Sequence, residues 1–319
     1  MGVTRTVRER IDPQVRARLD RLVELVGPQG LAGIEEIAER RQCHAELAAT
    51  VGRRPMPEDV EVGDHLVDGL LLRTYRRAGS DRPAPCIYYL HGGGLVSGSV
   101  AGDDGKAAAL AQDTGAVVVS VDYRLAPEHR YPAALDDCVR GLTWLAGEAE
   151  VLGIDAGRIA VHGSSAGGGL AAAAALRVRD DGGPAIALLM LISPMLDDRT
   201  SSPSTHANTG FGAWSREANV QAWQAYLGPD TDRVPSYAAP ARAQDLSGLP
   251  PVFVDTGDLD LFRDETLELA SRLMWSGVPV ELHVHPGAIH GGESIAPEAA
   301  LSVRARTLRV EALRRALAT

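Results

Sequence analysis

The sequence predicts an α/β fold with a mostly parallel central sheet flanked by helices. From about residue 59 onward, short and almost continuously apolar runs alternate with helical segments. Strands of this kind are buried on both faces, because the helices that connect parallel strands cover both sides of the sheet. The segment 1–55 and the interruption 197–245 show no β pattern. We therefore expect one sheet domain, formed by 56–196 and 246–319, with two helical additions.

Each element has its own pattern along the chain. A first helix should begin at Pro13, because Asp12 can cap it and apolar residues follow at helical spacing. A second helix should cover about Leu31 to Ala49. The β runs that follow are 69–77, 84–94, 116–127, 158–163, 185–195, 250–260 and 279–287. Helical patterns lie at 102–115, at 133–153, directly after residue 165, and at about 264–276.

The interruption at 197–245 is expected to form an inserted lobe, because a structureless loop of this length is rare in a compact domain. It also holds a group of large aromatic side chains, namely Phe211, Trp214, Trp223 and Tyr226.

The composition argues against several classes of protein. The chain is 45% hydrophobic and 23% charged, with a formal net charge of −10. Its basic residues are scattered among acidic ones, which argues against nucleic acid as a partner. No apolar run is long enough to span a membrane, and the N-terminus has no signal-peptide core. The three cysteines, Cys43, Cys86 and Cys138, are odd in number and show no CxxC spacing, so we expect a cytoplasmic protein with reduced thiols.

The residues 163–167, Gly-Ser-Ser-Ala-Gly, match the pattern G-x-S-x-G with Ser165 at its centre. A nucleophile on a sharp strand-to-helix turn needs small neighbours two residues away on either side. The turn would expose the serine hydroxyl at a helix N-terminus, where developing negative charge is favoured. The alternative is a glycine-rich turn without chemistry, since the chain contains 34 glycines. Other motifs have to decide between the two.

His91-Gly92-Gly93-Gly94 follows an expected strand and favours chemistry at Ser165. Backbone N–H groups in such a loop can approach an oxyanion, together with the N–H of Ala166. A phosphate-binding glycine loop is the alternative. It would need a Walker lysine or Gly-x-Gly-x-x-Gly spacing, and neither is present.

A serine nucleophile needs a histidine base and an acid that orients it. His290 lies just past the last expected strand, whereas His283 and His285 lie on that strand. A metal site at this histidine pair would lack an evident third ligand.

For the acid we favour Asp260, in the loop after the strand that contains PVFV, residues 251–254. Asp258 is its main rival, since Asp255 still belongs to the strand and Asp264 is expected to cap the next helix. The chain order Ser165, Asp260, His290 is that of a triad spread over the strand ends of one sheet.

On these motifs the chain resembles the hormone-sensitive-lipase-like family of α/β-hydrolase esterases. The matching segments cover about residues 85–295 in family order: HGGGLVSGS, VSVDYRLAPEHRYPAALDDC, GSSAGGGLAA, SPMLDDR, DLDLFRDE and HPGAIHGG. The resemblance implies an α/β-hydrolase fold. The segments 1–55 and 197–245 would form a helical cap over the catalytic domain.

The resemblance also implies roles for single residues. Ser165 would be the nucleophile, Asp260 the acid and His290 the base. Gly93, Gly94 and Ala166 would donate to the oxyanion, and Gly92 would shape that loop. No cofactor and no metal are implied. The substrate pocket is expected to include Leu95, Ser164, Phe211, Trp214 and Leu261.

The sequence departs from the family pattern at three places. Ser164 stands where many members have Asp, Leu261-Phe262 replaces Pro-Leu, and Gly291-Gly292 replaces Gly-Phe. Two polar segments admit other interpretations. The loop 122–129 is expected to brace the structure rather than act in catalysis. Asp197-Asp198 should form salt bridges with Arg199 or another arginine rather than bind a metal.

These observations predict a carboxylic-ester hydrolase that acts on small esters with short- to medium-chain acyl groups. An amidase or a lactonase would use the same triad, because the pocket selects the leaving group. A non-catalytic small-molecule receptor on the same scaffold is the alternative from another class. A homodimer is expected only by resemblance.

Overall fold

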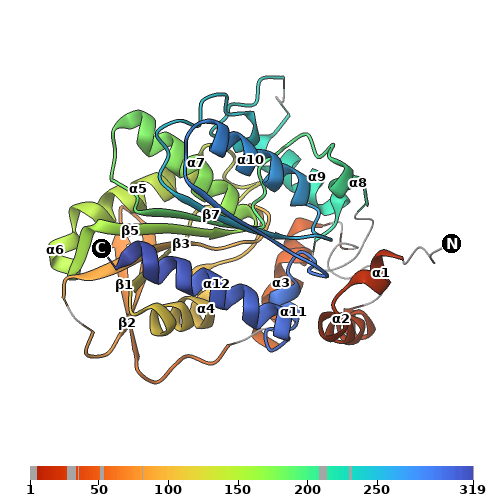
Figure 1. Cartoon of the computed structure of the whole chain (residues 1–319), viewed down its shortest axis with the longest axis horizontal. Coiled ribbons are helices and arrows are strands. Elements are labelled where there is room, and N and C mark those ends of the chain that lie inside the picture. Colours follow the sequence, from red (N-terminus) through yellow and green to blue (C-terminus); the bar gives the residue numbers. More distant parts are fainter. Residues whose placement is uncertain are drawn as a thin grey trace.

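The computed structural model describes residues 6–26, 34, 36–50, 54–80, 82–207, 214–229 and 232–318. Its centre is an eight-stranded sheet in the order β1-β2-β4-β3-β5-β6-β7-β8 (Figure 1). The β1–β2 and β2–β4 pairs are antiparallel, and all the other pairs are parallel. This sheet confirms the predicted α/β fold with its mostly parallel strands.

The bounds of the eight strands are Val60–Val67 (β1), Leu70–Arg77 (β2), Ala84–Leu90 (β3), Val117–Val121 (β4), Ile154–Ser164 (β5), Leu188–Ile192 (β6), Val252–Gly257 (β7) and Val280–His285 (β8). The strands whose ends lead into the site lie in the middle and on one side of the sheet. Strands β3, β4 and β7 are almost wholly buried, because helices cover both of their faces. The loops after β3, β5, β7 and β8 all open at the same edge of the sheet, since these strands are parallel.

Helices form a layer on each side of this sheet. Their bounds are Val7–Arg10 (α1), Pro13–Val26 (α2), Ile37–Thr50 (α3), Val100–Thr114 (α4), Ala133–Gly147 (α5), Ala149–Leu152 (α6), Ala166–Asp181 (α7), Pro203–Ala207 (α8), Arg216–Leu227 (α9), Arg263–Trp275 (α10), Gly292–Ile295 (α11) and Ala300–Leu317 (α12). Helices α5, α7 and α10 cover one face, and α4 and α12 cover the other (Figure 1). The larger core lies under α5, α7 and α10.

Several expected boundaries change in the structure. The helix expected at 133–153 is two helices, α5 and α6, which meet at Glu148. The strand β1 and the long helix α12 were not predicted. The expectation that Asp264 caps α10 was wrong. Phe262 occupies the N-cap without a side-chain hydrogen bond, and the Asp264 carboxylate instead accepts from the Ser204 amide at 2.7 Å.

The two helical additions are described only in part. Helix α2 begins at Pro13 as predicted, and the Asp12 carboxylate accepts from the amides of Gln14 and Val15 at 2.9 and 3.2 Å. Part of the second expected helix, at residues 31–33 and 35, lies outside the described residues. The described part of 197–245 contains α8, α9 and a 3-10 turn at Pro240–Arg242, and no strand. Among the described residues, no helix is both long and apolar enough to cross a membrane.

Candidate active site

Ser165 sits on a sharp turn between the end of β5 and the start of α7. Its backbone has φ 57° and ψ −122°, a conformation that residues other than glycine rarely adopt. The turn brings strand and helix so close that small neighbours are required. A Cβ on Gly163 would lie 2.0 Å from the carbonyl oxygen of Gly167, and a Cβ on Gly167 would lie 2.2 Å from that of Leu90. The two glycines therefore permit the turn that presents the serine.

Hydrogen bonds to the next strand hold the turn in place. The Ser165 amide donates to the Ile192 carbonyl at 2.8 Å, and the Met195 amide donates to the Ser165 carbonyl at 3.0 Å. These contacts compensate part of the cost of the strained backbone, and they fix the direction of the serine side chain.

Ser165, His290 and Asp260 form a continuous hydrogen-bonded chain. The Ser165 hydroxyl lies 3.0 Å from His290 Nε2, and His290 Nδ1 lies 2.9 and 3.2 Å from the two oxygens of Asp260. The carboxylate can only accept, so Nδ1 carries the proton and Nε2 is free to accept from the serine. Asp260 and His290 are 1% and 8% exposed, so little water competes for these bonds. The structure thus brings together the three residues that the sequence singled out.

The rival acids are all engaged elsewhere. Asp258 binds Gly287 and Arg10, Asp255 binds His285 and Arg309, and Asp264 binds Ser204 and Arg263. Asp260 also accepts from the Phe262 amide at 2.9 Å, which orients its carboxylate towards the imidazole.

Phe262 is a site residue that the sequence did not reveal. Its ring meets the His290 imidazole edge to face, with centroids 4.9 Å apart and an interplanar angle of 88°. This contact restricts the rotation of the imidazole. The replacement of Pro-Leu by Leu-Phe was visible in the sequence, but the contact depends on the fold of the 288–292 loop.

The glycine loop after β3 turns back towards Ser165. Gly93 and Gly94 have φ of 122° and 63°, and a Cβ on Gly92 would lie 3.5 Å from the Cβ of Ser165. Within the described residues, the amides of Gly93, Gly94 and Ala166 donate to no protein acceptor. Unpaired amides at a serine turn are available to an anionic ligand atom.

The side chains of His91 and Tyr123 hold the glycine loop after β3 in place. The rings are stacked with centroids 4.1 Å apart, and the Tyr123 hydroxyl donates to the His91 carbonyl at 2.8 Å. His91 Nδ1 donates to the Gly92 carbonyl at 2.8 Å. Burial lowers the pKa of His91, so this imidazole is neutral and serves as packing and as a hydrogen-bond donor.

A second group of buried ionisable residues lies under the site on the α4 and α12 side. Burial of Asp255 opposes its ionisation, but Arg309 and His285 together outweigh this effect and lower the pKa of Asp255. Burial and the Arg309 charge lower the pKa of His162 to about 4. On the opposite side, burial raises the pKa of Glu265 well above its ordinary value, and this side chain accepts from the Leu196 amide at 2.7 Å.

The predicted pocket residues fall into three groups. Leu95, Trp214 and Leu261 are 4%, 8% and 0% exposed and belong to the larger core. Ser164 is partly exposed beside the glycine loop. Phe211 lies outside the described residues. Trp214 contacts Gly94, so a residue of the 197–245 segment touches the loop after β3.

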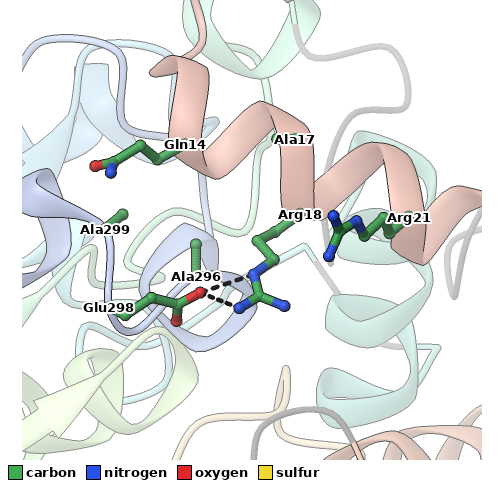
Figure 2. Close-up of a pocket in the computed structure, with 7 residues that line it drawn as sticks. All are labelled: Gln14, Ala17, Arg18, Arg21, Ala296, Glu298 and Ala299. Carbon is green, nitrogen blue, oxygen red and sulfur yellow. Dashed lines mark hydrogen bonds and ion pairs between the residues drawn. The ribbon is translucent and has the colours of Figure 1, made fainter.

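The cleft drawn in Figure 2 lies elsewhere, between α2 and the segment that leads into α12. It has a volume of about 250 Å³ and is lined by Gln14, Ala17, Arg18, Arg21, Ala296, Glu298 and Ala299. Arg18 is paired with Glu298, as Figure 2 shows. None of the predicted site residues lines this cleft.

The other polar candidates have structural partners. Asp197 pairs with Arg199 at 2.7 Å and Asp198 with Arg242 at 2.6 Å, which confirms the predicted salt bridges. His283 lies 3.0 Å from Glu281. In the part of the chain that the structure describes, no cluster of three or more His, Cys, Asp or Glu is placed to hold a metal.

The loop 122–129 makes bracing contacts. Asp122 accepts from the Val100 amide at 2.9 Å, and Arg124 pairs with the buried Asp137 at 2.8 Å. Glu128 pairs with Arg41 of α3 at 2.7 Å.

Comparisons with known proteins agree with this geometry. A profile described as the alpha/beta hydrolase fold matches residues 87–293. Esterase LipI of Mycobacterium tuberculosis is 36% identical over 266 residues, which cover 81% of each chain. Carboxylesterase NlhH of the same species is 40% identical over 238 residues, covering 73% of this chain and 74% of NlhH. The solved structure of a bacterial heroin esterase superposes with a TM-score of 0.89 at 35% identity, covering 98% of this chain and 99% of the esterase.

Proposed function

This chain belongs to the alpha/beta hydrolase family and is a serine hydrolase, and from this premise we propose that it is a carboxylesterase with Ser165, His290 and Asp260 as its catalytic triad. The observation that carries the proposal is the unbroken chain of hydrogen bonds from the Ser165 hydroxyl through His290 to Asp260. No other acid on the neighbouring loops contacts His290 among the described residues.

In the proposed reaction, His290 Nε2 takes the hydroxyl proton of Ser165 while Oγ attacks the ester carbonyl carbon. The imidazolium then gives this proton to the leaving alkoxide, the bond between the carbonyl carbon and this oxygen breaks, and an acyl-enzyme remains. Water repeats the two steps and releases the acid. Asp260 holds the tautomer that leaves Nε2 free and stabilises the imidazolium.

The tetrahedral intermediate needs donors for its oxyanion. The amides of Gly93, Gly94 and Ala166 suit this role, because they have no protein acceptor among the described residues. Gly92 would let the loop lie close to the serine, since a side chain there would approach Ser164 and Ser165. A preorganised donor of this kind contributes about 2.7–4 kcal/mol to the stability of the transition state.

We propose that 1–55 and 197–245 cap the catalytic domain formed by 56–196 and 246–319. The contact between Trp214 and Gly94 supports the second part of this cap. Leu95, Trp214 and Leu261 are buried, and we propose that they limit the acyl pocket to short- and medium-chain groups. The three free cysteines accord with the proposed cytoplasmic location.

The test is hydrolysis of a p-nitrophenyl ester series, from acetate to palmitate, by wild type and by Ser165→Ala. We expect activity with the shorter esters and a loss on the order of 10⁴–10⁶ in the variant. A Ser165→Ala variant as active as wild type would remove the nucleophile assignment. A folded wild type that cleaves no ester would instead favour an amidase or a non-catalytic receptor.

A further inference from the structure

We propose that Asp258 is a positioning residue, which locks the loop of the acid Asp260 to the loop of the base His290. The assignment rests on the proposed catalytic roles of these two residues. Asp258 is two residues before Asp260, and its carboxylate contacts the other loop and the N-terminal segment.

Both carboxylate oxygens of Asp258 are engaged. One accepts from the Gly287 amide at 2.6 Å, and the other accepts from the Arg10 guanidinium at 2.9 Å. Gly287 is three residues before His290. Hydrogen bonds to a charged acceptor are stronger than those between neutral groups, so this bond dominates the link between the loops.

Two backbone bonds run beside the Asp258 side chain. The Asp258 amide donates to the His285 carbonyl, and the Leu259 amide donates to the Ala288 carbonyl, each at 3.1 Å. The two loops therefore continue the pairing of β7 and β8 past the end of the strands. The Asp258 carboxylate stands where this pairing ends and the catalytic segment 288–292 begins.

Gly287 is held from both sides. Its amide donates to Asp258, and its carbonyl accepts from the Asp12 amide at 3.0 Å. Its φ is +81°, and a Cβ there would lie 3.0 Å from the Asp12 nitrogen. The close approach of the N-terminal segment thus requires a glycine, and it leaves the residue little freedom to move.

Apolar packing completes the arrangement next to His290. Ile289 is 5% exposed and shares a small core with Ile11, Val15 and Leu259. Helix α2 lies beside α11, as Figure 1 shows. The N-terminal segment consequently covers the base loop with its apolar residues, while Arg10 reaches the acid loop through Asp258.

This arrangement matters for the rate because His290 must meet Ser165 and Asp260 at once. A displacement of about 1 Å in a reacting group can cost on the order of 100-fold in rate. Without the Asp258 carboxylate, the base loop loses its charged link to the acid loop. The expected effect is on the chemical step rather than on substrate binding.

The chain offers a matched control in Asp155, at the start of β5 and thus at the opposite edge of the sheet. One of its oxygens accepts from the Gly157 amide at 2.9 Å and the other from Arg158 at 2.8 Å. It therefore makes the same two kinds of bond as Asp258, with a glycine amide and an arginine.

The experiment compares Asp258→Ala, Asp258→Asn, Asp258→Glu and Asp155→Ala with wild type. It measures kcat and KM for p-nitrophenyl esters and the rate at which a fluorophosphonate labels Ser165, followed by mass spectrometry. We expect Asp258→Ala to lower kcat and the labelling rate at least 10-fold, with KM within about 3-fold. Asp258→Asn keeps an acceptor for Gly287 but not its charge, so it should recover part of the rate and fall between Asp258→Ala and wild type. Asp155→Ala should match wild type.

If Asp258→Ala does not fold, Asp258→Glu provides the test. It keeps the charge but lengthens the side chain by one methylene, which displaces the loop, so labelling of Ser165 should still be slower than in wild type. A folded Asp258→Ala with kcat and labelling within 2-fold of wild type overturns the assignment, whatever its melting temperature. An equal loss in Asp155→Ala does so too. A wild type not labelled at Ser165 overturns the proposed function, and this assignment with it.

Discussion

The indole ring of Trp214 occupies the space that a side chain on Gly94 would need. A Cβ on Gly94 would lie 2.2 Å from Cη2 and 2.4 Å from Cζ2 of this ring. The indole is itself held, since its Nε1–H donates to Asn219 at 3.2 Å. A side chain from the 197–245 segment therefore limits the position of the glycine loop, and the two cannot be changed independently.

Gly94→Ala is expected to lower kcat by a factor on the order of 10²–10³, the cost of misplacing one oxyanion donor. The new methyl group would clash with Trp214, and the φ of +63° would add strain. Gly115→Ala is the control, because Gly115 has a φ of +75° and nothing within 4 Å of the new methyl group. Steady-state kinetics with both variants distinguishes the effect of the clash with Trp214 from the effect of backbone strain at a positive φ. Equal losses in the two would contradict the proposed role of the glycine loop.

Asp260→Asn is expected to keep the fold and to lower kcat on the order of 10⁴-fold. An amide in place of the carboxylate can donate to His290 Nδ1, which then favours the tautomer whose Nε2 carries the proton and cannot accept from Ser165. The measurement is kcat at neutral pH, with circular dichroism as a check of folding. Asp264→Asn serves as the control in the same segment, since Asp264 pairs with Arg263 and Ser204 rather than with His290.

Much of the fold was predictable because its signals are local. The buried strands β3, β4 and β7 are apolar runs bounded by turn residues, and the turn at Ser165 has glycines at the two positions where strand and helix touch. The triad residues follow strand ends, which a parallel sheet brings to one edge. Local pattern and overall fold agree at each of these places.

The elements that were missed lack such a local signal. Strand β1 is an edge strand in which exposed and half-buried residues alternate, so it has no apolar run. Helix α12 has arginines throughout, and Arg309 is used inside the protein against Asp255 rather than on the surface. The contact of Phe262 with His290 joins residues far apart in sequence, so only the packed structure reveals it.

Arg41→Met is expected to reduce stability by about 1–3 kcal/mol and to lower kcat/KM several-fold. The guanidinium of Arg41 donates to the carbonyls of Val96 and Ala126 and pairs with Glu128, so it ties α3 to the segment that follows the glycine loop. Methionine keeps the length of the side chain but leaves these carbonyls without their donor. Urea unfolding and initial rates are the measurements.

Arg77→Met is the control for this change. Arg77 pairs with Asp59 at 3.2 Å, and the two side chains are 56% and 40% exposed. Exposed pairs of this kind contribute about 0–1 kcal/mol. If Arg41→Met lowered the free energy of unfolding and kcat/KM no more than Arg77→Met does, the contacts between α3 and the segment after the glycine loop would contribute nothing to stability or rate.

His162 should make the protein sensitive to acid. Burial, followed by the Arg309 charge, lowers the pKa of this histidine from 6.5 to about 4, although Asp255 and Asp103 act in the opposite direction. The ring is stacked on Tyr89, with centroids 4.8 Å apart. The folded protein therefore binds fewer protons here than the unfolded chain between pH 6.5 and 4. The free energy of unfolding is therefore not reduced by His162 above pH 6.5. As the pH falls from 6.5 to 4, it decreases by roughly 3 kcal/mol in total because of this group.

His162→Gln removes this titration, so its free energy of unfolding should fall less than that of wild type between pH 7 and 4. Urea unfolding at several pH values measures the difference, and the exposed His129→Gln is the control. Because the other buried acids titrate in all three proteins, their contribution cancels in the comparison. Parallel curves for wild type and His162→Gln would mean that protonation of His162 does not oppose folding. The acid sensitivity of the protein would then arise at the carboxylates, with Asp255 and its Arg309 partner as the first pair to examine.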